Sequence, residues 1–457
     1  MAPAAGVIDV PALIPATTSH VGNVFFGLAL ALVFLRFSII HQVLSYLLGA
    51  NLYLLYLIGI PAIFGVFVTG RLYDVLRTPT SRYWTLYALW IAAAVPFSYW
   101  PGHSFSVLSE YLRTNLVMLF VIAGLTVNWN QCRRMMFVIA AGALTNLMTA
   151  ELFAGSRYGG RLSLGAGSIA DPNDFAAHLL LVLPFLLWVV FSARFTPFRL
   201  AALLGIAAGM FYVLRTASRG ALIGIAAGVL FYLFRATTRQ RLALACLAPA
   251  VLAFLIVAVP KNSWDRLLSL SRDTGTEGET TEAAQSTESR EYLLRKSLQY
   301  TFEHPVFGVG PGEFSEYEGV NNRLTGMTHG YWHDTHNTLT QVSSECGIPA
   351  AIFFIAGIAS TFGLLNRTYR EAKRRANCQD IRNTAFCLML AFTAFCTATA
   401  FLNFAYFFYY PAMGGLAIAV ASAAKEEFRA RDRLPAQPQQ AMPWAPPVRR
   451  SPAVKPA

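Results

Sequence analysis

The stretch HGYWHDTHNTLTQVSSECGIPA, residues His329–Ala350, separates a polar part of the chain from an apolar one. It contains His329, His333 and His336, and the chain after it stays apolar for about 20 residues, the thickness of a membrane. A neutral imidazole can accept a proton near pH 7, so a histidine where the chain enters a bilayer favours chemistry at the membrane surface. Such histidines can also be part of the polar and aromatic belt at a membrane interface, and the stretch alone does not decide between the two interpretations.

The composition around this stretch is that of a polytopic membrane protein. Hydrophobic residues make up 55% of the chain and charged residues 13%, and the mean hydropathy is +0.46. We expect an all-α fold with about twelve transmembrane helices, because that many runs approach the length needed to cross the hydrocarbon layer. The predicted spans are residues 21–40, 48–69, 83–100, 110–127, 135–154, 173–192, 200–215, 220–234, 242–259, 347–366, 383–402 and 405–423.

The positions of lysine and arginine predict the orientation of these spans. Basic residues follow every even-numbered span, so both termini are expected in the cytoplasm. This divides the chain into the first nine spans (1–259), a periplasmic loop with helices of its own (260–346), three further spans (347–423) and a disordered cytoplasmic tail (424–457). The basic residues that follow the even-numbered spans are Arg71, Arg77, Arg82, Arg133, Arg134, Arg194, Arg199, Arg235, Arg239, Arg241, Arg367, Arg370, Lys373, Arg374, Arg375 and Arg382.

The net charge of +12 follows from this pattern and does not indicate a nucleic-acid partner. The six cysteines are scattered, mostly inside or beside apolar runs, so neither a disulfide framework nor a cysteine metal site is expected.

A smaller set of arginines falls on the opposite, periplasmic face. Arg157, Arg161, Arg215, Arg219 and Arg290 break the positive-inside pattern, and binding an anion would explain their placement. Arg215 and Arg219 belong to RTASRG, a connection between two spans that is too short to leave the membrane surface. The planar guanidinium group suits a phosphate or diphosphate, although two arginines reaching toward water would give the same sequence.

Arg290 is expected in the first turn of a helix at residues 290–303, where it and the helix N-terminus could face one anion. A solvated arginine is the alternative. The preceding segment, residues 272–289, is acidic and rich in Ser, Thr and Gly, which predicts a flexible segment. His304-Pro305 should end the helix, and GVGPGEF, residues 308–314, should form a turn.

Asp171-Pro172-Asn173-Asp174 could suggest a metal site, but the order of residues is better explained as a helix start. Asp171 would be the N-cap, and Pro172 would occupy the first helical position.

Three segments together resemble the superfamily of O-antigen ligases and Wzy-type polymerases, which are bacterial envelope glycosyltransferases. They are SRG at 218–220, SREYLLRKSLQYTFEHPVFGVGPGEF at 289–314 and THNTLTQVSSECGIP at 335–349. One departure is Ala350, where members often have glycine. The resemblance implies transfer of a glycan from an undecaprenyl diphosphate carrier to an acceptor hydroxyl. The reaction would take place at the periplasmic face of the inner membrane, without a nucleotide sugar, a metal or another cofactor.

The resemblance also implies roles for individual residues. His336, in the His-Asn pair, would be the general base, and Arg219 and Arg290 would hold the diphosphate. The charge argument adds Arg215. Further candidates for substrate binding are Asn337, Arg157 and Arg161.

The expected function is that of an O-antigen ligase acting on lipid A–core oligosaccharide, with membrane lipids around it. An O-antigen or exopolysaccharide polymerase is the alternative, and a protein O-glycosylation ligase is less favoured. A polysaccharide transporter or lipid flippase is disfavoured, because the chemistry-bearing residues gather on one face and not near mid-membrane.

Overall fold

The computed structural model describes residues 20–153, 155–157, 161–164, 167–236, 277–325 and 332–433, together with isolated positions between 238 and 264. These residues are helical apart from loops and one two-stranded hairpin. The first half contains α1 (His20–Ser38), α2 (Ile40–Leu48), α3 (Leu54–Val68), α4 (Arg71–Leu76), α5 (Pro79–Ala94), η1 (Val95–Phe97), α6 (Pro101–Glu110), η2 (Tyr111–Leu116), α7 (Val117–Leu125), α8 (Trp129–Phe153), β1 (Gly155–Arg157), β2 (Arg161–Ser163) and α9 (Pro172–Ser192). The second half contains α10 (Thr196–Arg215), α11 (Arg219–Arg235), α14 (Glu277–Glu303), α15 (Phe314–Thr325), α16 (Thr338–Arg374), α17 (Gln379–Thr399) and α18 (Tyr409–Asp432).

Within the described residues, 7 helices are long and apolar enough to cross a membrane. They are α1, the continuous segment from α6 to α7, α8, α9, α10, α16 and α17. Helices α3, α5, α11 and α18 occupy four more of the predicted spans. The predicted span 242–259 falls almost entirely outside the described residues, so the expected all-α polytopic fold is confirmed while the count of twelve stays a prediction.

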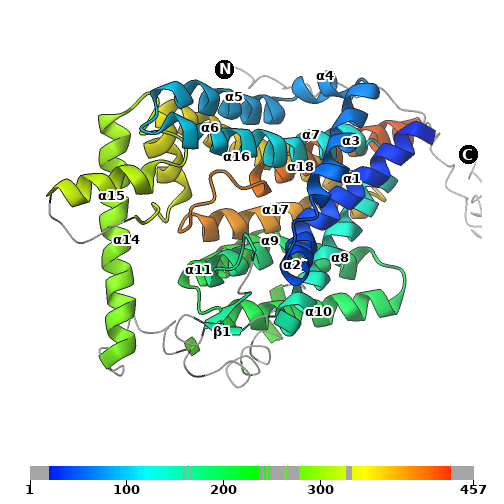
Figure 1. Ribbon diagram of the computed structural model, residues 1–457. Coiled ribbons are helices and arrows are strands. Elements are labelled where there is room, and N and C mark those ends of the chain that lie inside the picture. Colours follow the sequence, from blue (N-terminus) through cyan, green and yellow to red (C-terminus); the bar gives the residue numbers. More distant parts are fainter. Residues whose placement is uncertain are drawn as a thin grey trace, which may run out of the picture.

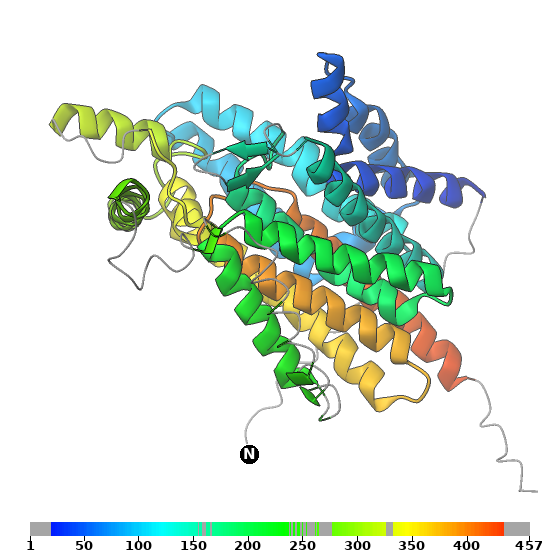
Figure 2. The ribbon, with the colours of Figure 1, turned by 90° about the horizontal axis from the view of Figure 1, so that it is seen from below.

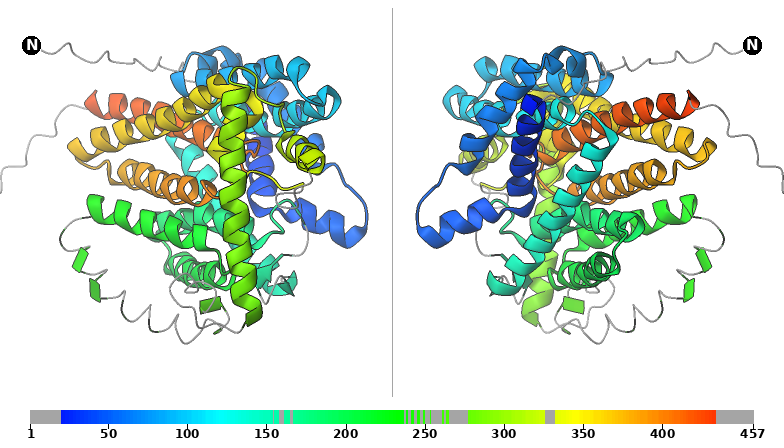
Figure 3. Two further views of the ribbon diagram at one scale, coloured as in Figure 1. Left: turned by 90° about the vertical axis from the view of Figure 1, so that its left-hand side faces the viewer. Right: turned by 90° about the vertical axis from the view of Figure 1, so that its right-hand side faces the viewer.

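The long helices run alongside one another, and one helix lies across their ends. Helix α9 packs against α8, α10 and α17, while α17 also packs against α11 and α16 (Figure 1). Seen from below, α14 is viewed along its axis whereas α10 and α11 are seen lengthwise (Figure 2). The left view of Figure 3 shows α14 standing across the end of the bundle. This end is the one that carries His336.

Helix α14 corrects one sequence-based prediction. It begins at Glu277, so the segment expected to be flexible is helical from that residue onward, and Arg290 lies in the middle of the helix instead of its first turn. The reason is composition, because Glu, Ala and Gln favour a helix even without an apolar stripe. The argument that Arg290 shares an anion with its own helix N-terminus is therefore wrong. The predicted end before His304-Pro305 is confirmed, since α14 ends at Glu303.

The predicted turn at 308–314 holds the start of α16 in place. Val309 N donates to Ser344 O at 2.8 Å, and Gly310 N donates to Glu345 O at 2.9 Å. Gly347, with φ of 81°, interrupts α16 next to this turn, and a Cβ atom there would lie 2.1 Å from Val306 O. Only glycine fits such a left-handed position in so close a contact. The turn and the break in α16 therefore hold each other in place. They are separated from His336 by the first, short segment of α16.

Aromatic side chains form much of the core between α5, α16 and α18. Trp84 and Phe354 are both fully buried, and their ring centroids lie 5.4 Å apart with the rings nearly perpendicular. Tyr410 packs against Phe354 at 4.9 Å. Pairs of this kind add about 0.5–1.5 kcal/mol beyond the burial of their area. They fix the helices that carry the loop around His336.

Candidate active site

His336 lies in the loop that leads into α16, in a backbone conformation that few non-glycine residues adopt. Its φ is +48°, in the left-handed region. Such a backbone costs an L-residue roughly 1–2 kcal/mol. The next residue, Asn337, is the N-cap of α16, and its side-chain oxygen accepts from Leu339 N and Thr340 N at 3.0 and 3.1 Å. The His-Asn pair is thus the point at which an extended loop turns into a helix.

The end of α17 and the loop between α17 and α18 form hydrogen bonds with residues on both sides of His336. Thr338 Oγ1 donates to the backbone oxygens of Thr399 and Leu402 at 2.7 and 2.8 Å. On the other side of His336, Asn403 Nδ2 donates to Asp334 Oδ2 at 2.6 Å. The side chains flanking His336 are therefore anchored to one neighbouring loop, which maintains the strained backbone at His336.

The surroundings of His336 favour its neutral form. Burial is the main reason that the pKa of His336 is lowered from 6.5 to about 4. Nearby Arg290 and His333 lower the pKa further, while Asp171 acts in the opposite direction. The ring is therefore uncharged near pH 7 and able to accept a proton. Burial also raises the pKa of the neighbouring Asp334.

The RTASRG connection forms a tight turn between α10 and α11. Helix α10 ends at Arg215, Ser218 is the N-cap of α11, and Arg219 is its first residue. Between them Ala217 has φ of +50°, which is also in the left-handed region. The guanidinium of Arg215 lies over the ring of Phe211, 5.7 Å from its centroid.

Arg161 braces this turn. Its Nε donates to Thr216 O at 2.8 Å, and its Nη2 donates to Asn173 Oδ1 at 2.8 Å. Arg161 begins β2 of the hairpin, opposite Arg157 in β1. The hairpin therefore ties the α10–α11 turn to the first turn of α9. The side chain of Arg157 lies outside the described residues.

The N-terminus of α11, the start of α9 and Arg290 meet around a small pocket. Ser218, Gly220, Asn173 and Arg290 line it, together with residues from the end of α17. The free backbone N–H groups and the dipole of a helix N-terminus attract an anion, and a guanidinium on the opposite side adds a full positive charge. Arg219 begins the same helix. Both features suit a phosphate group, but the pocket is closed in this structure and has no free volume for even a water-sized group, so binding a phosphate requires it to open.

The structure brings some predicted residues together and leaves others apart. Arg290 lies near His336 and lines the pocket at the N-terminus of α11, the helix that begins at Arg219, and Arg161 is bonded to the turn before that helix. Arg215 lies beside Tyr212, which donates a hydrogen bond to Glu151. His329 falls outside the described residues.

Asp171 and Asn173 were not predicted as part of the site. Asp171 and Pro172 form the predicted start of α9, which is confirmed, with Asp171 Oδ1 accepting from Asn173 N at 2.8 Å. No local sequence pattern indicates that Asp171 also interacts with His336, because that interaction depends on how α9 packs. Asn173 was noted only as part of the helix start. Within the described part of the chain, no group of three or more His, Cys, Asp or Glu side chains could hold a metal ion.

The fold and the site together define a multi-pass membrane protein in which a half-buried, neutral histidine lies near Arg290, and Arg290 lines a small pocket at the N-terminus of α11. Residues 200–355 match the family model for O-antigen ligase. This segment runs from α10 to the first half of α16 and contains Arg215, Arg219, Arg290 and His336. The predicted resemblance to the O-antigen ligase and Wzy-type polymerase superfamily is confirmed over these residues, and it supports an enzyme of the ligase or polymerase kind. No curated protein matches the chain.

Proposed function

We propose that the protein is an O-antigen ligase-like glycosyltransferase of the bacterial inner membrane. It transfers a glycan from undecaprenyl diphosphate to a hydroxyl of lipid A–core oligosaccharide at the periplasmic face. The observation that carries the proposal is the convergence of neutral His336, Arg290 and the N-terminus of α11 at one end of the helix bundle. The match of residues 200–355 to O-antigen ligase supports the same class of reaction.

The donor diphosphate binds between α11 and α14. Arg219, Arg290 and the backbone N–H groups at the start of α11 hold its negative charge, and Arg215 lies close enough in the chain to contribute. Charge-assisted hydrogen bonds of this kind are about twice as strong as neutral ones. The same groups stabilise the diphosphate as it gains charge on departure, which is the larger contribution to rate.

His336 acts on the acceptor. A ring nitrogen accepts the proton of the acceptor hydroxyl, and the resulting oxygen attacks the anomeric carbon of the glycan. The bond between that carbon and the phosphate oxygen breaks, and undecaprenyl diphosphate leaves with its electron pair. The negative charge of Asp171 interacts with His336 and stabilises the imidazolium formed in this step.

The test is a transfer assay with the purified full-length protein. The protein is incubated with a lipid-diphosphate glycan and either lipid A–core oligosaccharide or a second lipid-linked glycan, and products are identified by mass. The proposal expects a product one glycan heavier than lipid A–core, absent with Arg219→Ala. Extension of the second lipid-linked glycan instead would identify a polymerase and reject the ligase assignment. No product with either acceptor would reject both.

A further inference from the structure

A second pocket lies at the opposite end of the same helices. It is formed where α9, α11, α16 and α17 end or begin, and its cavity has a volume of about 140 Å³ and opens to the surface. Helix α11 connects the two ends, with Arg219 at its start and Arg235 at its end, about 24 Å apart at 1.5 Å per residue. The pocket is therefore separated from the candidate active site by roughly the thickness of a membrane core.

Three cations from three different helices face this pocket. Arg235 is contributed by α11, Lys373 by α16 and Arg382 by α17. None of them forms an ion pair with a carboxylate of the described residues. Arg382 also lies in the first turn of α17, where a positive charge opposes the helix dipole. A bound anion would pair with these cations and would offset the unfavourable interaction of Arg382 with the helix dipole.

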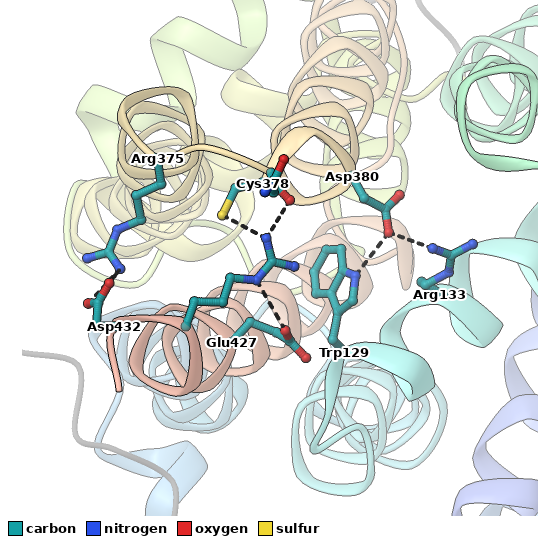
Figure 4. Close-up of polar contacts among 9 residues, drawn as sticks. Trp129, Arg133, Arg375, Cys378, Asp380, Glu427 and Asp432 are labelled. Atoms are coloured by element: carbon teal, nitrogen blue, oxygen red, sulfur yellow. Dashed lines mark hydrogen bonds and ion pairs between the residues drawn. The ribbon is translucent and has the colours of Figure 1, made fainter. Parts of the chain in front are cut away.

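The other arginines at this end of the molecule contrast with these three. Arg133 pairs with Asp380 at 2.8 Å, and Arg375 pairs with Asp432 at 2.8 Å (Figure 4). Asp380 lies next to the pocket in α17, but it also accepts hydrogen bonds from Trp129 and Ser192. The carboxylate nearest in sequence to Arg382 therefore bonds to other groups and forms no ion pair with Arg382.

Arg235 is held in a fixed position before any ligand binds. Its Nη2 donates to Asn366 Oδ1 at 2.7 Å, and its guanidinium lies 4.8 Å from the ring centroid of Tyr369 and 5.4 Å from that of Phe231. A guanidinium between two aromatic rings loses little further freedom when an anion binds.

The walls of the pocket indicate the nature of the anion. Tyr232, Tyr369 and Phe386 line it, and Phe191 at its edge is 40% exposed. Phe234, which precedes Arg235 in α11, is 74% exposed, and in a membrane protein such an exposed ring is a surface for acyl chains. A small soluble anion would gain nothing from these apolar groups, whereas a phospholipid would place its phosphate on the cations and its chains on the aromatic surface. Basic pockets between transmembrane helices are suited to anionic lipid head groups.

We infer that this pocket binds the phosphate head group of an anionic phospholipid, such as phosphatidylglycerol. The ligand joins α11, α16 and α17 at the end of the bundle that the positive-inside pattern assigns to the cytoplasm. The inference does not depend on the proposed glycan transfer, because it uses neither His336 nor the residues around it.

The test compares lipid binding to two charge-matched variants of the full-length protein. The pocket variant is Lys373→Gln with Arg382→Gln, and the control is Arg370→Gln with Arg374→Gln, which removes two exposed cations from the same end of α16. Native mass spectrometry measures retention of phosphatidylglycerol against phosphatidylcholine. The pocket variant should bind phosphatidylglycerol about 30-fold more weakly, at about fivefold for each charge, and the control should match the unaltered protein.

Three results would overturn the inference. The first is equal weakening in the pocket variant and the control, and the second is no preference of the unaltered protein for phosphatidylglycerol. The third is complete displacement of the lipid by millimolar inorganic phosphate, which would identify a site for a free anion. If the double variant does not fold, Lys373→Gln alone serves the same purpose, because Lys373 is exposed and its loss should still weaken binding about fivefold.

Discussion

His336 combines two properties that a purely structural residue would not need. It holds a left-handed backbone that costs roughly 1–2 kcal/mol, and its half-buried side chain is neutral. Ala217, in the α10–α11 turn, has the same backbone conformation, as do Trp332 close to His336 and Ile39, Tyr53 and Asn377 in other parts of the described chain. Strained positions of this kind persist where the surrounding contacts over-determine them, and they gather at functional sites. Both turns belong to the end of the bundle that carries the candidate active site.

Replacement of His336 tests its role as general base. His336→Asn is the most informative change, because asparagine tolerates the left-handed backbone but cannot act as a base. Transfer should fall by about 10²–10⁴-fold while the thermal unfolding temperature stays near that of the unaltered protein. His333→Ala is the control and should stay within several-fold of normal activity. Near-normal transfer by a folded His336→Asn protein would reduce His336 to a structural residue.

The lowered pKa of His336 predicts an unusual pH profile. Burial, assisted by Arg290 and His333, brings the pKa to about 4, so the ring loses its ability to accept a proton only as the pH falls through about 4. The acid limb of kcat/KM, which reports the free enzyme, should therefore lie well below the 6.5 of an ordinary histidine. Arg290→Gln removes one of the cations and should shift this limb upward. An acid limb near pH 6.5 in the unaltered protein would contradict the assignment.

Among the helices and strands, the sequence predicted those ends that are marked by local capping residues and prolines. Asp171-Pro172 and His304-Pro305 mark the start of α9 and the end of α14, because caps and prolines act over a few residues. The start of α14 at Glu277 was missed, since its helix formers carry no apolar stripe. The hairpin at 155–163 was also missed, because strands of three residues give almost no periodicity.

The hairpin gives Arg161 a positioning role that a mutation can separate from direct binding. Arg161→Lys cannot reproduce the two hydrogen bonds to Thr216 O and Asn173 Oδ1, which come from different guanidinium nitrogens. A lost bond to a charged group costs about 1.5–3 kcal/mol, so the thermal unfolding temperature should fall and donor KM should rise. Arg199→Lys is the control, because Arg199 donates to Ala193 O at the other end of α10. It should lower stability without changing donor KM.

The break in α16 predicts a contrast between two glycines of one helix. Gly347→Ala requires a left-handed alanine with its Cβ 2.1 Å from Val306 O, so it should lower the unfolding temperature sharply. Gly363→Ala, in the regular part of α16 with no heavy atom within 4 Å of the added Cβ, should be neutral or slightly stabilising. Equal unfolding temperatures for the two variants would contradict the fixed turn at residues 308–314.

For the molecule as a whole, the sequence predicted the kinds of residue in the site better than their arrangement. His336, Arg219 and Arg290 could be proposed because their chemistry is unusual on that side of a membrane protein. The approach of Asp171 to His336 could not, because it depends on α9 and α16 meeting through the loop between α17 and α18. Such contacts join residues that are far apart in the sequence, 61 positions for Thr338 and Thr399, and leave no local pattern.

The two ends of the bundle make the membrane orientation testable. Arg133, Arg235, Lys373 and Arg382 gather at one end, and the positive-inside pattern places that end in the cytoplasm. Alkaline phosphatase fused after residue 275 should be active, because it would lie in the periplasm with α14, whereas a fluorescent protein fused after Arg433 should fluoresce. The reciprocal fusions should be silent and serve as controls. Fluorescence from a fusion at residue 275 would place His336 on the cytoplasmic side, where a lipid-linked glycan already carried across the membrane could not reach it.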